Sequence, residues 1–385
     1  MAPFTRLRVA TLLTALALSL PAAAACSAQT PGPVDAFSHQ IAADVEADGI
    51  GGITAAVFKG DQVLWAQGYG WADPSAGVPA GVRTIYRTGS ISKSFTAVLL
   101  ADLVEEGLFE LDDPVVRTLP EVSQFGDAPE GMHPITFRQL ASHTAGLIRE
   151  PALEGAAAGP IDAWGDKILA SIPRTRFYTM PGTQYQYSNI GFGVLGYALE
   201  RGAGISFIDM IEDRIFNPLG MHSSTFIVGP ELSRRLAVGF ANGGGENVDA
   251  DFPALEHVGR GYKVPNGGVY STVADLATFA AAVMGRTEHA VLEPVTREEV
   301  MRSQTPQDGP GYGLGFSIRP ITLPDGSPRT LVGHGGSVAG YNAYLVFEPE
   351  SGYGVVMLRN YNSGATNLGR ASDLLLGELL TAERD

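Results

Sequence analysis

The stretch Gly89-Ser90-Ile91-Ser92-Lys93 opens the strongest helical pattern in the chain. Apolar residues recur at helical spacing after it and predict a helix over residues 91–108. Residues three apart share one face of a helix, so the Ser90 hydroxyl and the Lys93 amine can meet. Burial beside a helix N-terminus lowers a lysine pKa, which would let Lys93 activate the serine. S-x-x-K is short enough to arise by chance, however, with Ser90 as a helix cap and Lys93 on the surface.

Strand patterns lie toward both ends of the chain. Residues 53–59 and 62–69 are rich in β-branched and aromatic side chains, and Gly60-Asp61 between them predicts a tight hairpin. Near the other end, strands are predicted over residues 314–319, 341–348 and 353–359, before an amphipathic helix over residues 367–380.

The middle of the chain is predicted to be mostly helical. Helical patterns cover residues 192–203 and 207–216, and Thr272 to Asp275 has the form of a capping box that opens a helix through Met284. Strands at both ends with helices between them predict one sheet closed by the two termini, with a helical lobe inserted. The predicted sheet lobe covers about residues 37–85 and 311–385, and the predicted helical lobe covers about residues 86–310.

A second segment with chemical potential is Tyr187-Ser188-Asn189. Residues two apart point the same way along an extended segment. A phenol near a lysine can share in proton transfer, and an amide can hold both a substrate carbonyl and the lysine. Taken alone, a loop tyrosine packed by its ring is the simpler interpretation.

A third segment is His334-Gly335-Gly336-Ser337, between a β-like run and the strand predicted from Tyr341. Paired glycines allow a substrate backbone to approach closely, and the N–H that follows them could complete an oxyanion hole. Taken alone, a hairpin turn with a surface histidine is the simpler interpretation.

The three segments together resemble a known family. S-x-x-K, then Y-x-N about 100 residues later, then H-x-G near the C-terminus follow the motif order of the serine β-lactamase and penicillin-binding-protein superfamily. The chain resembles the class C-like branch of that superfamily from Phe37 to Leu380. Supporting stretches are residues 135–147, 218–221, 267–272 and 312–316.

The resemblance implies a fold and a set of roles. The family fold is α+β, an antiparallel sheet flanked by helices with a mostly helical lobe. Ser90 would be the nucleophile, Lys93 and Tyr187 would share general acid/base duty with the base unassigned, and Asn189 would position the substrate. His334 would stand where β-lactamases carry lysine, and Gly336 would help to bind substrate. The N–H groups of Ser90 and Ser337 would form the oxyanion hole.

The third motif departs from the β-lactamase form K-T-G. His334 replaces a charged lysine, and Gly335 removes a hydroxyl. Losing a charge-assisted hydrogen bond costs about 1.5–3 kcal/mol of binding. The H-x-G form looks more like the family's esterases, D-aminopeptidases and D-Ala carboxypeptidases. The chain is therefore predicted to be a serine hydrolase acting on an ester, amide or peptide, with β-lactam hydrolysis less favoured. The alternative is a penicillin-binding sensor, or an inactive paralogue that is acylated without turnover.

Composition excludes several other functions. The chain has 385 residues and a net charge of −15, so it lacks the basic character of a nucleic-acid-binding protein. Its seven histidines are scattered and there is no H-E-x-x-H, so neither a metal nor a cofactor is expected. G-x-G-x-x-G at residues 191–196 follows a polar segment, which argues for helix-packing glycines rather than a dinucleotide site. His143 is predicted to be a buried structural residue.

The N-terminus has the pattern of a secretory signal. Arg6 and Arg8 precede an apolar run and a series of small residues, which predicts a signal peptide over residues 1–25 and a linker over residues 26–36. The single cysteine, Cys26, excludes a disulfide within the chain and is a possible lipidation site. We expect a secreted or periplasmic protein that is either free or a lipoprotein anchored at Cys26, with membrane contact only through that anchor.

Overall fold

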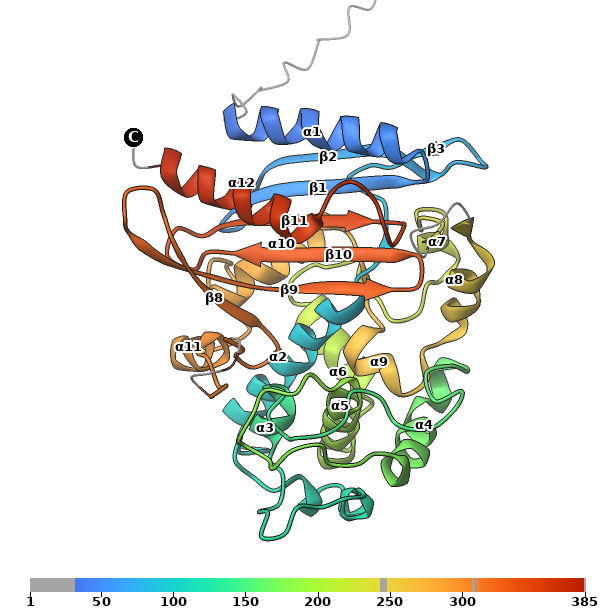
Figure 1. Cartoon of the computed structure of the whole chain (residues 1–385), viewed down its shortest axis with the longest axis vertical. Helices are drawn as coiled ribbons and strands as arrows, with labels where there is room; N and C mark the ends of the chain where they lie inside the picture. The colour runs from blue at the N-terminus through green and yellow to red at the C-terminus, as the bar shows by residue number, and fades with distance from the viewer. Residues whose placement is uncertain (1–31, 243–247, 307–308, 310, 384–385) are drawn as a thin grey trace, which may run out of the picture.

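A seven-stranded antiparallel sheet forms the upper part of the molecule (Figure 1). The computed structural model describes residues 32–242, 248–306, 309 and 311–383. The strand order is β3-β2-β1-β11-β10-β9-β8. The strands are β1 (Gly52–Lys59), β2 (Gln62–Asp73), β3 (Val78–Pro79), β8 (Ser317–Thr322), β9 (Pro328–Val338), β10 (Tyr341–Phe347) and β11 (Tyr353–Arg359). Because β1 pairs with β11, the sheet is built from both chain ends, as predicted.

The predicted strands near the chain ends are confirmed with small shifts. The β1–β2 hairpin turns at Gly60-Asp61, whereas β8 begins at Ser317, three residues later than predicted. The simpler interpretation of His334–Ser337 as a hairpin turn with a surface histidine does not hold, because these residues lie inside β9, His334 is buried, and the hairpin follows at Ala339-Gly340. Tyr341 to Phe347 pair with Val338 to Val332, which extends the strand pattern through the glycines.

Helices cover both faces of the sheet. Helices α1 (Gly32–Asp48) and α12 (Leu368–Ala382) pack on one face, and α10 (Val273–Val283) packs on the other. Strand β1 is buried on both faces: Val57 belongs to the apolar cluster under α1 and α12, and Phe58 to the cluster on the opposite side. This explains why β1 has a continuous apolar run rather than an alternating one.

The predicted linker overlaps α1, and the predicted signal peptide lies outside the described residues.

The helical lobe lies below the sheet in Figure 1, around helix α2 (Ser92–Glu105). Every residue from Ser92 to Ala101 is buried, so the first ten residues of α2 are enclosed on all sides. The other helices are α3 (Phe137–Ala141), α4 (Trp164–Ser171), α5 (Asn189–Ala203), α6 (Phe207–Ile211), α7 (Pro230–Ser233), α8 (Asp251–Leu255), α9 (Val264–Gly267) and α11 (Pro294–Met301). A Cβ on Gly196 of α5 would lie 2.4 Å from Pro265, which accounts for that glycine by packing.

Two helix predictions need correction. Thr272 caps α10, its hydroxyl accepting from the Asp275 N–H at 3.2 Å, but the Asp275 carboxylate accepts from Ser223 and Ser224 instead of completing a capping box. The helix predicted over residues 207–216 changes winding after Ile211 and continues as a π-helical turn.

None of the helices in the described part of the chain is long and apolar enough to cross a membrane.

Candidate active site

Ser90 lies where the helical lobe meets the sheet. It belongs to the 3₁₀ turn Gly89–Ile91 that leads into α2, and this turn contacts β9. A Cβ on Gly336 would lie 1.9 Å from the Thr88 carbonyl, so only glycine allows the strand to approach the turn so closely. Gly89 has φ +55° and would place a Cβ 2.7 Å from the Ser337 nitrogen. The main-chain N–H groups of Ser90 and Ser337 therefore lie in one small region.

The edge of β9 beside Ser90 is not covered by its neighbouring strand. Strand β8 pairs with β9 only as far as Gly333, so β9 continues beyond the end of that pairing from His334 to Val338. A strand edge of this kind can hold an extended substrate backbone and donate an N–H to a carbonyl oxygen.

Lys93 is completely buried beneath Ser90. Its Nζ lies 3.1 Å from the Ser90 Oγ, and it donates to the Asn189 side-chain oxygen at 2.8 Å and to the Asn266 carbonyl at 3.2 Å. Burial lowers the pKa of Lys93 well below its usual value, and the nearby Arg149 cation lowers it further. Both effects favour the neutral amine over the ammonium form.

A hydrogen-bonded chain fixes the Asn189 amide. The Asn189 Nδ2 donates to Glu150 at 2.6 Å, and the second Glu150 oxygen pairs with Lys263 at 3.2 Å. This arrangement turns the Asn189 carbonyl oxygen toward Lys93. The expectation of one extended segment is wrong here, because Asn189 is the first residue of α5 while Tyr187 lies in the preceding loop. Both residues nevertheless face Lys93.

Tyr187 covers the lysine with its ring. The Lys93 Nζ lies 4.8 Å from the ring centroid. Burial raises the pKa of Tyr187 to about 12, although a hydrogen bond to Ser90 acts in the opposite direction. The phenol is therefore protonated at neutral pH. Behind it, the His143 ring lies 4.1 Å from the Tyr187 ring centroid.

His143 is buried, as predicted from the sequence. Its φ of +60° is unusual for a residue with a side chain. The Ser188 N–H donates to its Nδ1 at 3.1 Å, so the ring supports the turn that carries Tyr187. Burial lowers the pKa of His143 well below its usual value, and Lys93 adds to this effect.

His334 is also buried and uncharged. Its Nδ1 lies 2.6 Å from the Gly335 carbonyl, which can only accept, so Nδ1 carries the proton and Nε2 accepts from the Tyr312 hydroxyl at 3.0 Å. Burial lowers the pKa of His334 to about 3, with Lys93 contributing. His334 therefore occupies the predicted position without supplying the positive charge of a lysine. Tyr312 lies in a stretch that resembles a family signature, but sequence reasoning did not place it in the site.

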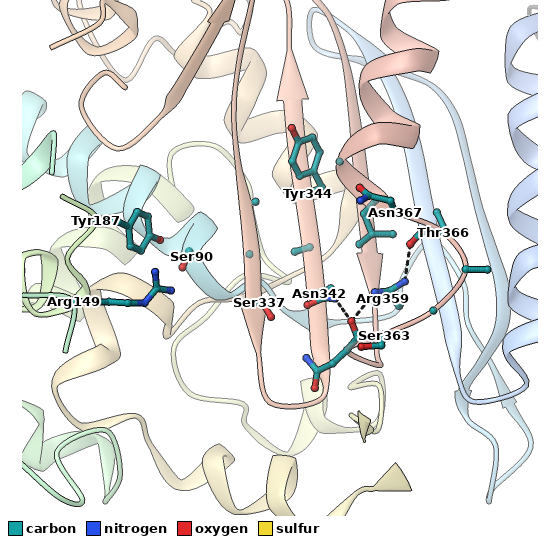
Figure 2. A pocket seen from close by; sticks show the side chains of 18 residues that line it. Ser90, Arg149, Tyr187, Ser337, Asn342, Tyr344, Arg359, Ser363, Thr366 and Asn367 are labelled. Carbon is teal, nitrogen blue, oxygen red and sulfur yellow. Dashed lines mark hydrogen bonds between the residues drawn. The ribbon is translucent and has the colours of Figure 1, made fainter. Parts of the chain in front are cut away.

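A pocket of about 660 Å³ opens over Ser90 (Figure 2). Four predicted site residues line it: Ser90, Tyr187, Gly336 and Ser337. The other three, Lys93, Asn189 and His334, are buried and do not line it. Further lining residues, which no sequence motif indicated, are Arg149, Asn342, Ala343, Tyr344, Arg359 and residues 362–369. No group of histidine, cysteine, aspartate or glutamate in the described part of the chain could hold a metal ion.

A buried lysine beside a serine at a helix start, between an antiparallel sheet and a helical lobe, defines the fold class of β-lactamases and transpeptidases. The family model described as Beta-lactamase matches residues 37–378. The chain therefore belongs to the β-lactamase family and is a serine hydrolase of that family.

Relatives in this family have several activities. The chain is 29% identical to the human putative beta-lactamase-like 1, over 89% of this chain and 68% of that protein. It is 26% identical to the D-alanyl-D-alanine-carboxypeptidase/endopeptidase AmpH of Escherichia coli (strain K12), covering 86% of this chain and 85% of that protein. A D-stereospecific amidohydrolase from Streptomyces sp. superposes with a TM-score of 0.69 at 26% identity, covering 89% of this chain and 98% of that one.

Proposed function

We propose that the protein hydrolyses an ester or amide through an acyl-enzyme on Ser90, with Lys93 as the base. One observation carries this assignment. A neutral amine has two N–H groups and one lone pair, and the two carbonyl oxygens that face Nζ take both N–H groups. The lone pair is thereby left for the Ser90 hydroxyl, 3.1 Å away.

The reaction divides into two acyl transfers. As Ser90 Oγ bonds to the substrate carbonyl carbon, its proton passes to Lys93 and the oxyanion accepts from the N–H groups of Ser90 and Ser337. The bond to the leaving group then breaks, and the protonated Tyr187 phenol donates to that group while Lys93 returns a proton to Tyr187. Water attacks the acyl-enzyme in the same way, which releases the acid and restores Ser90.

The favoured substrates are amides or short peptides of D-amino acids, with esters as simpler surrogates. Two similarities support this choice, namely those to the D-alanyl-D-alanine carboxypeptidase and to the D-stereospecific amidohydrolase. β-Lactam hydrolysis is expected to be poor, because the neutral His334 cannot replace the lysine of the K-T-G motif.

The first test is mass spectrometry of the intact protein after brief exposure to a fluorophosphonate probe. We expect one adduct on the wild type and none on the Ser90→Ala variant. A labelled wild type should then turn over short-chain esters or D-aminoacyl amides. A burst of one product equivalent without turnover would support the penicillin-binding sensor instead, and an unlabelled, folded wild type would contradict the proposed chemistry.

We also propose that the protein is exported, on the sequence pattern of residues 1–25, and that Cys26 is its only candidate lipid anchor. Cell fractionation of the wild type and of Cys26→Ser tests this directly. Release of the variant from the membrane fraction would support the anchor, and an unchanged distribution would exclude it.

A further inference from the structure

The pocket over Ser90 has a charge opposite to that of the protein. Among the described residues that line it, Arg149 and Arg359 are the charged ones, and there is no aspartate or glutamate. The whole chain carries a net charge of −15. A cationic cleft in an acidic protein concentrates anionic ligands and disfavours cationic ones.

Only one of the two arginines is available to a ligand. The side chain of Arg359 donates to the main-chain carbonyls of Tyr361, Asn362 and Thr366 at 2.8–2.9 Å. It is 4% exposed, and its hydrogen bonds hold the loop that forms one wall of the pocket (Figure 2). Its donors are therefore committed to the fold.

Arg149 is held in place but its guanidinium is accessible. Its carbonyl accepts from the Asn189 N–H at 2.9 Å, which fixes its backbone to the start of α5. The side chain is 63% exposed, its Cζ lies 4.8 Å from the Tyr187 ring centroid, and Figure 2 shows it directed toward Ser90. Stacking on an aromatic ring orients a guanidinium and leaves its edge free to bind a carboxylate.

The neighbouring carboxylate does not satisfy Arg149. Glu150 is its one ion-pair partner among the described residues, at 3.8 Å, which is too long for a hydrogen bond. The oxygens of Glu150 are instead taken by Asn189 at 2.6 Å and Lys263 at 3.2 Å. The positive charge of Arg149 is thus left to face the pocket.

We propose that Arg149 binds a carboxylate of the substrate on the Tyr187 side of Ser90. The proposal deepens the function proposed above and rests on it. The structure carries no cation at the third motif, where His334 is neutral, and instead presents one in the loop that follows α3. A substrate with an acidic group on this side of the scissile bond would be preferred over its uncharged analogue.

Arylboronic acids test this without knowledge of the natural substrate, since boron forms a tetrahedral adduct with a nucleophilic serine oxygen. We would compare 3-carboxyphenylboronic acid with the nearly isosteric, neutral 3-carbamoylphenylboronic acid, and likewise the two 4-substituted compounds. The readout is protection of Ser90 from the fluorophosphonate probe. At least one carboxylate should protect the wild type on the order of tenfold better than its carboxamide.

Variants assign that preference to a residue. Arg149→Gln should reduce the ratio to about one, and Arg149→Lys should restore part of it. Arg370→Gln removes the same charge from the exposed start of α12 and should keep the wild-type ratio. Thermal unfolding and circular dichroism check that each variant is folded.

The outcomes separate the two proposals. Carboxylates that protect no better than carboxamides, or a preference that survives in Arg149→Gln, would overturn the role of Arg149 while Ser90 labelling still supports the hydrolase. A wild type that the fluorophosphonate does not label would overturn both.

Discussion

The two sides of the active site use different chemistry. The helical-lobe side contains a chain of polar and ionisable side chains that runs from the buried Lys93 and Asn189 to the partly exposed Glu150 and Lys263. The sheet side presents main-chain groups of β9 and also contains a buried neutral pair, His334 with Tyr312. The proposed mechanism therefore places proton transfer in one lobe and uncharged substrate contact in the other. If the charge of the substrate is recognised, that recognition must therefore come from the helical lobe, which also performs the proposed proton transfer.

The largest effect should come from removing the base on the helical-lobe side. Lys93→Ala should lower kcat/KM by about 10³–10⁴-fold, because Ser90 loses the group that accepts its proton. The measurement is steady-state hydrolysis of the best ester found for the wild type. Lys167→Ala, which removes a lysine bonded to the Gly155 carbonyl, is the matched control and should retain activity. Comparable losses in both variants would contradict the assignment.

On the sheet side the large effect should be on stability rather than on rate. Below pH 6.5 the unfolded chain protonates His334, whereas the folded protein does so only near pH 3. The free energy of unfolding should therefore fall as the pH falls across this window, by up to about 5 kcal/mol from this group.

Denaturant unfolding at pH 7 and pH 4 measures this contribution. His334→Gln should lose clearly less stability than the wild type between the two values. His289→Gln, which removes an exposed histidine, should behave as the wild type does. If His334→Gln and the wild type lose the same stability, His334 is not held neutral.

A smaller effect should follow from separating the members of the neutral pair. Tyr312→Phe removes the hydroxyl that donates to His334 Nε2, and an unsatisfied buried acceptor costs about 1–3 kcal/mol. Tyr341→Phe removes a buried hydrogen bond to Ala237 and should destabilise the protein similarly. Only Tyr312→Phe should also alter the NMR titration of His334. Identical titrations in both variants would show that the pair is not coupled.

The sequence could predict the features that depend on local patterns. Ser90 and Lys93 were placed together because helical spacing is a local property, and β1 and β11 were found because each is a continuous apolar run. The segment around His334 is harder to predict, since paired glycines favour a turn unless tertiary pairing extends the strand, as the pairing of β9 with β10 does here. Gly336 is required there because a Cβ would lie 1.9 Å from the Thr88 carbonyl oxygen, a tertiary contact that no local pattern encodes.

Residues that act through long-range contacts were not predictable. Arg149, Glu150 and Tyr312 are ordinary members of loops in the sequence, and their importance arises from packing against Tyr187, Asn189 and His334. The local sequence around Arg149 and Glu150 offers no signal for these contacts, whereas Tyr312 lies in a stretch that resembles a family signature without an indicated role. Similarly, Asn189 was found by its motif, but its place at the start of α5 follows from the Ser188 cap, whose hydroxyl accepts from the Gly191 N–H at 3.0 Å.

The smallest effect, and the sharpest test of the helical-lobe chain, should come from Glu150→Gln. Glu150 does not touch the Ser90 hydroxyl, so we expect kcat to fall only about tenfold as the Asn189 amide loses a charge-assisted partner. Glu150 also raises the pKa of Lys93, so its neutralisation should lower that pKa further and move the acid limb of the kcat profile to lower pH. A purely structural defect would reduce kcat without moving the limb.

Glu154→Gln removes an equivalent charge from an exposed loop position and should leave both kcat and its pH profile unchanged. A limb that stays in place in Glu150→Gln would mean that the chain orients Asn189 but does not tune the base.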